Sequence, residues 1–236
     1  MRHSRLIVAW AAVCLLLAHS PAPAQLLRID QGRFYFLAGN AMTSMNQIND
    51  RLDTFLDFRI DGDFNTLGAG FYLNLIDNWT LGGEIDLMRS RSEPIAAYKG
   101  EYSGRYGYVN IGYLYHSGGG LNIYPVLGLG SAVMNIDITP LAGTVIGNPS
   151  GLYDTTKLSA ASFNVKVGAN VDYMFTLKKN EGGKNWGLVL GFQMAYQVTP
   201  MQSRWERSGI SLFDDPEFKL KGAFLGLSVG FGWAED

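Results

Sequence analysis

Apolar and polar residues alternate with a period of two along most of the chain, which is typical of β-strands with one apolar and one polar face. The alternation predicts eight strands, most of them ten or more residues long. Strands in soluble sheets have about 5–6 residues, whereas a tilted strand that crosses a bilayer needs about 9–11. The predicted strands are residues 33–39, 64–76, 79–89, 105–116, 120–137, 158–176, 186–198 and 219–234. Pro125 lies inside the fifth of them and requires a bulge or a strand end there.

The last predicted strand shows most clearly how the two faces differ. Apolar residues from Leu225 to Trp233 occupy one face, and the alternate positions are small, including Gly226 and Gly230. A soluble antiparallel sheet normally places one face on a core and the other in water. We interpret the apolar face as the outer surface of a barrel in lipid, and the sparse face as one wall of a narrow lumen.

The connections between the predicted strands alternate in length. Three are short: the turn around Asn78 and the segments 117–120 and 176–185. Four are long and span roughly residues 40–63, 90–104, 138–157 and 199–218. Short turns on one side and long loops on the other are typical of a bacterial outer-membrane barrel. We therefore predict an all-β, eight-stranded antiparallel up-and-down transmembrane barrel, with short turns and both termini in the periplasm and long extracellular loops.

Aromatic residues gather at the strand ends on the predicted short-turn side. Some begin strands that leave this side, and others end strands that arrive there. Outer-membrane barrels carry such girdles of aromatic residues at the membrane interfaces. We predict a periplasmic aromatic girdle formed by Trp79, Tyr113, Tyr115, Tyr173, Trp186, Phe231 and Trp233.

Several charged residues fall on the inward faces of the predicted strands. Buried charges must be paired or hydrated, so we expect Lys166 to lie against Glu84 and Asp86, with Asn170 and Asp172 further along the same network. We interpret this lumen network as structural, and a gated ion path is the alternative. The strand number argues against a wide diffusion pore, because the side chains of an eight-stranded barrel roughly fill its interior.

The N-terminus predicts export from the cytoplasm. A short basic stretch precedes the apolar residues 6–18, and Ala22-Pro23-Ala24 then forms a small-x-small cleavage pattern. This is the layout of a secretory signal peptide, and an uncleaved anchor is the alternative. We expect residues 1–24 to be removed and residues 25–236 to form the barrel domain. Cys14 is the one cysteine of the chain, so the exported part has no disulfide.

The composition agrees with a membrane barrel and argues against other classes. Charged residues make up 17% of the chain, against about 25% in typical soluble domains, and 29 residues are glycine. The formal net charge is −2, so nothing indicates a nucleic-acid partner.

The chain resembles the small eight-stranded outer-membrane barrels, namely the OmpA-like and OmpW-like barrels and the general outer-membrane β-barrel domain proteins. The segment KGAFLGL is similar to the assembly signal of such barrels, with Lys221, then Gly222, then Leu225 and Leu227 two residues apart. Those barrels usually end on an aromatic residue, whereas AED follows Trp233 here. The resemblance implies a place in the Gram-negative outer membrane and the barrel-assembly machinery as a partner during biogenesis.

The first long connection contains a predicted amphipathic helix within residues 43–58. Its apolar positions Met45, Ile48, Leu52 and Phe55 recur at helical spacing. The helix could close the barrel mouth, lie on the membrane interface or bind a partner. We favour closure, because other long connections also carry apolar residues.

The chain offers little that indicates chemistry. His116 beside Ser117 invites a hydrolase interpretation, but the predicted topology places both at the periplasmic rim, far from lipid of the outer leaflet. Asp57, Asp61 and Asp63 lie close together but lack the spacing of a calcium-binding EF-hand loop. We predict no catalytic, cofactor or metal site and expect that the protein is not an enzyme.

The leading functional hypothesis is an integral outer-membrane barrel with a structural or surface-interaction role. The alternatives are a narrow, porin-like channel or transporter for small or hydrophobic solutes, a lipid-modifying enzyme of the outer membrane, and a soluble lipocalin-like binder with its faces reversed. The expected partners are outer-membrane lipid and lipopolysaccharide, the barrel-assembly machinery, and an extracellular ligand or protein bound by the long loops.

Overall fold

A computed structural model describes most of the predicted barrel. The described residues are 29–46, 49, 62–75, 78–90, 98–140, 155–179, 184–203, 205–207, 210–211 and 221–235. The predicted signal peptide, residues 1–24, lies outside them and stays a prediction.

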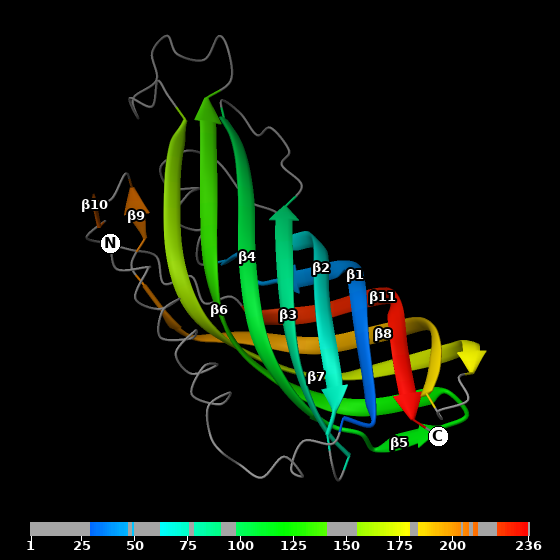
Figure 1. Ribbon diagram of the computed structural model, residues 1–236. Coiled ribbons are helices and arrows are strands. Elements are labelled where there is room, and N and C mark those ends of the chain that lie inside the picture. The colour runs from blue at the N-terminus through cyan, green and yellow to red at the C-terminus, as the bar shows by residue number, and fades with distance from the viewer. Residues whose placement is uncertain are drawn as a thin grey trace.

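Eight long strands form the framework of the described residues, and each corresponds to one predicted strand. They are β1 (Gln31–Thr43), β2 (Asp63–Asn74), β3 (Trp79–Ser90), β4 (Tyr98–Tyr113), β6 (Leu121–Pro140), β7 (Thr156–Lys179), β8 (Lys184–Gln202) and β11 (Lys221–Glu235). Three short strands complete the described sheet: β5 (His116–Gly118), β9 (Glu206–Arg207) and β10 (Ile210–Ser211). Figure 1 shows the long strands winding around a common axis.

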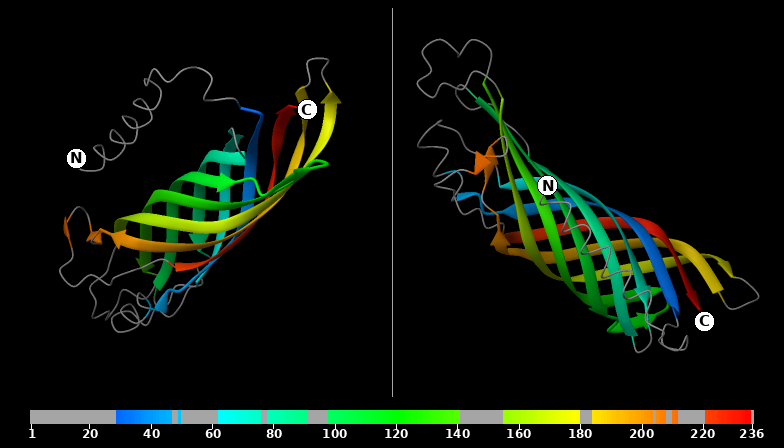
Figure 2. Two further views of the ribbon diagram at one scale, coloured as in Figure 1. Left: turned by 90° about the horizontal axis from the view of Figure 1, so that it is seen from below. Right: turned by 60° about the vertical axis from the view of Figure 1, so that its left-hand side comes forward.

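The sheet closes on itself. Each long strand pairs antiparallel with the next one along the chain, and β11 pairs back to β1 through residues from Gln31 to Thr43. Following paired residues once around the ring from Arg33 returns to β1 at Thr43, ten residues further on. With ordinary strand spacings, this stagger over eight strands requires a tilt of about 40°. The oblique strands are visible in both views of Figure 2. The prediction of an eight-stranded antiparallel barrel is confirmed.

The short connections lie at the same end of the barrel as the start of β1 and the end of β11. The amide of Glu235 donates to the carbonyl of Asp30 at 2.8 Å, which joins the end of β11 to the start of β1. The tight turns at this end use left-handed backbone at Asn78 (φ 66°), Gly119 (φ 58°) and Gly120 (φ 88°), a conformation that glycine and asparagine adopt most readily. The predicted separation of short turns from long loops is therefore confirmed for the described residues.

Pro125 lies where the partner strand of β6 is interrupted. On that edge, β4 pairs with β6 up to Val126, and pairing resumes with β5 at Ile123. Pro125 falls opposite this break, where it is not required to donate an amide hydrogen. A broken partner strand thus accommodates the proline that the sequence places inside a long strand.

Strands β4, β6 and β7 extend beyond their neighbours at the long-connection end (Figure 1). The outward face of this extension is polar, and Lys99 donates to Glu101 there at 2.7 Å. In the strand register, Asp137 on β6 lies opposite Glu101 on β4 and opposite Lys157 on β7. These charges indicate that the extension projects into water.

The faces of the strands are arranged as predicted, with apolar side chains outside. Leu227 is 67% exposed and Phe36 is 72% exposed, whereas Tyr35 and Leu37, which flank Phe36 on β1, face inward and are buried. Gly230 faces inward against the backbone of Phe34, so a Cβ there would overlap that carbonyl. The small inward residues of β11 therefore let its neighbours approach closely.

An apolar cluster fills the lumen toward the long-connection end. Phe64 and Tyr102 pack with ring centroids 4.7 Å apart, and Trp205 is almost wholly buried. Met45 belongs to this cluster, and its carbonyl accepts the amide of Asn49 at 2.9 Å, which is one helical turn. The other apolar positions of the predicted helix, Ile48, Leu52 and Phe55, lie outside the described residues.

Candidate functional site in the barrel lumen

A buried cation on β7 meets two carboxylates on β3 across the lumen. Lys166 Nζ forms an ion pair with Glu84 Oε1 and lies 3.7 Å from Asp86 Oδ2. The side chains of these residues are at most 4% exposed. Both carboxylates face inward because they are separated by one residue on β3, and successive strand residues alternate between faces. Lys166 is thus held between two acceptors.

Glu84 is the centre of the hydrogen bonding around this cation. The Tyr35 hydroxyl donates to Glu84 Oε2 at 2.7 Å, and Gln193 Nε2 donates to the same oxygen at 3.2 Å. Lys166 Nζ also lies 4.4 Å from the centre of the Tyr108 ring, a distance suited to a cation–π contact. Side chains from five strands therefore meet in a single charged cluster.

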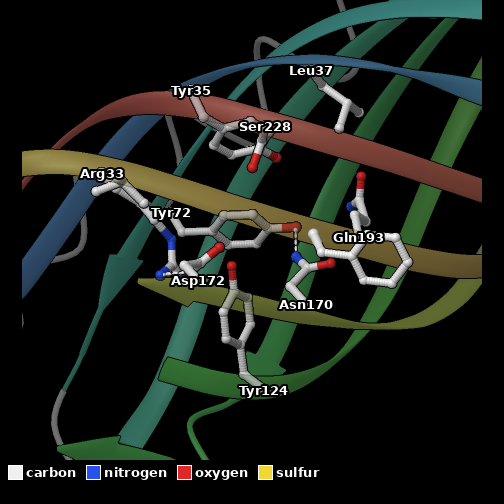
Figure 3. A pocket seen from close by; sticks show the side chains of 11 residues that line it. Arg33, Tyr35, Leu37, Tyr72, Tyr124, Asn170, Asp172, Gln193 and Ser228 are labelled. Atoms are coloured by element: carbon white, nitrogen blue, oxygen red, sulfur yellow. Dashed lines mark hydrogen bonds and ion pairs between the residues drawn. The ribbon is translucent and has the colours of Figure 1, made fainter. Parts of the chain in front are cut away.

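A second ion pair lies nearer the short-connection end. Arg33 Nη1 pairs with Asp172 Oδ2, and both side chains are buried. The guanidinium carbon lies 4.2 Å from the centre of the Tyr124 ring and 5.2 Å from that of Tyr72. Figure 3 shows Arg33 and Asp172 facing each other beside these tyrosines. Asp172, expected in the Lys166 network, is thus neutralised by a different cation.

Tyr72 connects the two charged clusters. Its hydroxyl accepts hydrogen bonds from Asn110 Nδ2 at 3.0 Å and from Asn170 Nδ2 at 3.3 Å (Figure 3). Its ring stacks on Tyr35, with centroids 5.6 Å apart and planes within 10°, and Tyr35 in turn donates to Glu84. Inward polar residues from most of the long strands thus form a continuous layer across the barrel.

The space left inside this layer is very small. A cavity of about 10 Å³ lies between Arg33, Tyr72, Asn170 and Gln193, which is about enough for one water molecule. Arg33 Nε, Asn170 Oδ1 and Gln193 Oε1 are buried there without a hydrogen-bond partner among the described residues. The lumen is therefore polar but closed at this level.

Sequence reasoning missed Arg33 and most of the lumen tyrosines. The available signal was the phase of β1, because Arg33, Tyr35 and Leu37 alternate with the exposed Phe34 and Phe36. The sequence predicts only a short strand over residues 33–39, and Arg33 is not among the predicted lumen residues. The tyrosines were overlooked because an aromatic ring fits either face of a membrane barrel.

The predicted aromatic girdle residues lie on the outside at the short-connection end. Trp79 packs against Tyr113 across the β3–β4 pair, with ring centroids 5.6 Å apart. Trp186 packs against Trp233 at 5.7 Å across the β8–β11 pair. The remaining residues of the set are also exposed: Tyr115, Tyr173, Phe231.

The segment similar to an assembly signal lies at the start of β11. Lys221 is exposed at the long-connection end, and Leu225 and Leu227 point outward. Gly222 lies against the backbone of Met42 on β1, so a side chain there would disturb ring closure. The four residues are thus on the strand that completes the barrel.

The pair His116 and Ser117 does not form a nucleophile–base couple. His116 is exposed on β5 at the short-connection end. The Ser117 hydroxyl donates to Asn122 Oδ1 at 2.9 Å, so its proton points away from the imidazole. Among the described residues, no group of three or more histidine, cysteine, aspartate or glutamate side chains could hold a metal ion.

None of the helical segments in the described part of the chain has both the length and the apolar character that a membrane-spanning helix needs.

Comparisons with known proteins find similarity among solved structures. No protein-family profile and no curated protein sequence matches the chain. Among solved structures, it is similar to the attachment invasion locus protein Ail of Yersinia pestis, with 11% identity, a TM-score of 0.46, and coverage of 87% of this chain and 99% of that one. A major outer membrane protein of Thermus thermophilus has 12% identity, a TM-score of 0.41 and coverage of 85% and 98%. Neisserial surface protein A has 11% identity, a TM-score of 0.38 and coverage of 87% and 96%.

These likenesses concern the course of the strands, at identities too low to transfer a role. The barrel itself rests on the strand pairing of this chain, with β1 joined to β11. The described part of the chain is an antiparallel β-barrel with eight long strands.

Proposed function

We propose that this protein is an integral β-barrel of the bacterial outer membrane with a structural or surface-interaction role, and that its lumen does not conduct solutes. The short connections lie in the periplasm and the long ones at the cell surface. Residues 1–24 act as a signal peptide that is removed during export, and residues 25–236 form the barrel domain.

The closed lumen is the observation that carries this proposal. Two buried ion pairs cross it, and the cavity beside them measures about 10 Å³. The apolar cluster around Phe64 and Tyr102 closes it again toward the long-connection end. An ion or solute that carries its water cannot pass two such barriers in series without rearrangement of the side chains.

The outer surface supports a position in the membrane. On β3 the outward residues from Trp79 to Leu87 are uncharged, and Arg89 follows at the long-connection end. The outward positions of β11 from Leu225 to Trp233 are likewise apolar. Nine residues of a strand tilted by about 40° match the length needed to cross a bilayer.

The partners follow from this placement. The segment from Lys221 to Leu227 is the part that the barrel-assembly machinery would recognise, and the outward apolar belt contacts membrane lipid, including lipopolysaccharide. The long connections at the cell surface are where an extracellular ligand or protein would bind. The protein acts by holding this surface in place, without catalysis.

Fractionation and planar-bilayer recording test the proposal together. We expect the protein to leave bacterial envelopes only with detergent and to migrate faster on gels when unheated, because the closed barrel resists denaturation by detergent. The folded protein should give no stable current steps in a bilayer. Recovery in the soluble periplasmic fraction would refute the membrane placement, and reproducible single-channel steps would refute the closed lumen.

A narrow channel is the second candidate, and the ion pair between Lys166 and Glu84 is the observation that favours it. Such a pair could open and close a polar path, since both partners are charged side chains on opposite walls. Under this alternative, Lys166→Ala would change the size or frequency of current steps. If the wild type and this variant are both silent, the structural role stands.

A further inference from the structure

The outer surface of the barrel carries an apolar groove across β2, β3, β4 and β6. The groove has a volume of about 750 Å³. Its open floor is formed by the small outward residues Gly107 and Ser131, and Leu129 flanks it. The Phe71 ring lies over Gly83 and borders the floor on the β2 side. Gly107 has no atom within 4 Å of the position that a Cβ would occupy. The groove is therefore a real depression in the belt that faces lipid.

Two arginines lie at the long-connection end of this groove. Arg105 is the next outward residue after Gly107 on β4, about 7 Å along the strand. Arg89 on β3 is the diagonal neighbour of Arg105, because Leu87 is the residue directly opposite Arg105. Diagonal neighbours on one face of a sheet are about 7–8 Å apart, within reach of long side chains. The two guanidinium groups can thus approach one ligand together.

Both arginines are exposed, and neither forms an ion pair within the described part of the chain. Two outward carboxylates, Glu101 and Asp63, are also diagonal neighbours of Arg89, on the side away from the groove. Glu101 is paired with Lys99 at 2.7 Å, and Asp63 lies on β2 beyond the position opposite Arg89. The end of the groove therefore presents two guanidinium groups that have no carboxylate partner among the described residues, at the level where the apolar belt meets polar residues.

We propose that the groove and the two arginines bind one anionic lipid of the outer leaflet, with its phosphate between Arg89 and Arg105 and an acyl chain over Gly107 and Ser131. The orientation of this lipid agrees with the proposed topology of the barrel. The arginines lie toward the long connections, and the groove runs from them toward the membrane centre. Arginine suits phosphate because its planar donors bind two oxygens at once. The proposal rests on the barrel spanning the membrane as proposed above.

Spin-labelled lipids provide the test. The full exported chain is reconstituted into phosphatidylcholine vesicles, and heat-modifiable mobility first establishes that each variant is a folded barrel. Electron paramagnetic resonance then measures the relative association of phosphatidic acid and phosphatidylcholine that carry the label near the end of one chain. We expect the wild type to prefer phosphatidic acid by about fivefold or more at one site, the size expected from basic residues near anionic lipid.

Two matched pairs of variants locate the site. Arg89→Gln with Arg105→Gln should abolish the preference, whereas Lys178→Gln with Lys179→Gln, which removes the same charge at the other end, should retain it. Gly107→Leu fills the groove without a clash and should reduce the preference by about threefold or more. Ala223→Leu adds bulk to an outward position of β11 and should leave the preference unchanged.

The outcomes separate this inference from the proposed function. A folded, inserted wild type without preference for phosphatidic acid refutes the lipid site alone, whereas a chain that does not insert refutes the membrane placement on which the site rests. Loss of preference in the lysine control refutes a localised site. Full retention in Gly107→Leu, or displacement of the labelled lipid by millimolar glycerol phosphate, refutes the role of the groove.

Discussion

Replacing Lys166 by methionine tests the central ion-pair cluster of the lumen. In the native barrel this lysine faces Glu84 and Asp86, and these side chains are at most 4% exposed. Lys166→Met keeps most of the side-chain volume but leaves two neighbouring carboxylates without a cation. Breaking a buried pair in this way destabilises proteins by about 3–5 kcal/mol.

A second substitution, Glu84→Gln, makes this prediction specific, because its effect on stability should change sign when Lys166 is already methionine. Glu84→Gln alone should have a smaller effect, since Lys166 still has Asp86. Combined with Lys166→Met, it removes one of the two unpaired carboxylates, so the double variant should be more stable than Lys166→Met alone by about 1 kcal/mol or more.

Urea unfolding of the barrel in lipid vesicles, followed by tryptophan fluorescence, gives the free energies of unfolding of the wild type, the two single variants and the double variant. Lys99→Met is the matched control, because Lys99 pairs with Glu101 at 2.7 Å while both side chains remain about half exposed. Exposed pairs contribute about 0–1 kcal/mol. The reasoning is wrong if Lys166→Met destabilises no more than Lys99→Met, or if Glu84→Gln adds its full cost to the double variant.

Three further variants test the faces of the barrel and its short-connection end. Gly226→Leu with Gly230→Leu should prevent heat-modifiable barrel formation by overpacking the lumen, and normal folding of this variant would show that the faces are reversed. Val229→Arg, on the outward face of β11, should lower the free energy of unfolding in lipid vesicles by about 2–4 kcal/mol; an effect near zero would place this position in water. His116→Ala should leave the free energy of unfolding and the detergent resistance of cells unchanged, because the imidazole is exposed and the adjacent serine bonds to Asn122; a loss of detergent resistance in cells would contradict this.

The strands and their faces could be predicted because they depend on residue order alone. Period-two alternation identified all eight long strands, and their length indicated a membrane barrel. The same phase places Lys166 and Glu84 on the inward side. Which inward side chains contact each other across the lumen depends on the stagger of ten residues around the ring. No single strand encodes this stagger.

The errors of sequence reasoning follow from that limit. Arg33 and Asp172 are separated by 139 residues in the chain, and the short first strand gave no secure register for Arg33. The outer groove likewise depends on pairing. Gly107 and Ser131 lie far apart in the sequence and become neighbours in one depression only when β4 and β6 are placed side by side.

The ion pairs of the lumen also bear on the order of folding events. They join β3 to β7 and β1 to β7, and in the described ring these strands are separated by other strands. In a flat sheet their charges would lie apart and unneutralised, which hydrocarbon tolerates poorly. Curling of the sheet is therefore the event that converts charged residues into neutral pairs. We expect insertion and ring closure to proceed together, so that the polar inward face of the sheet stays in contact with water until β11 pairs with β1.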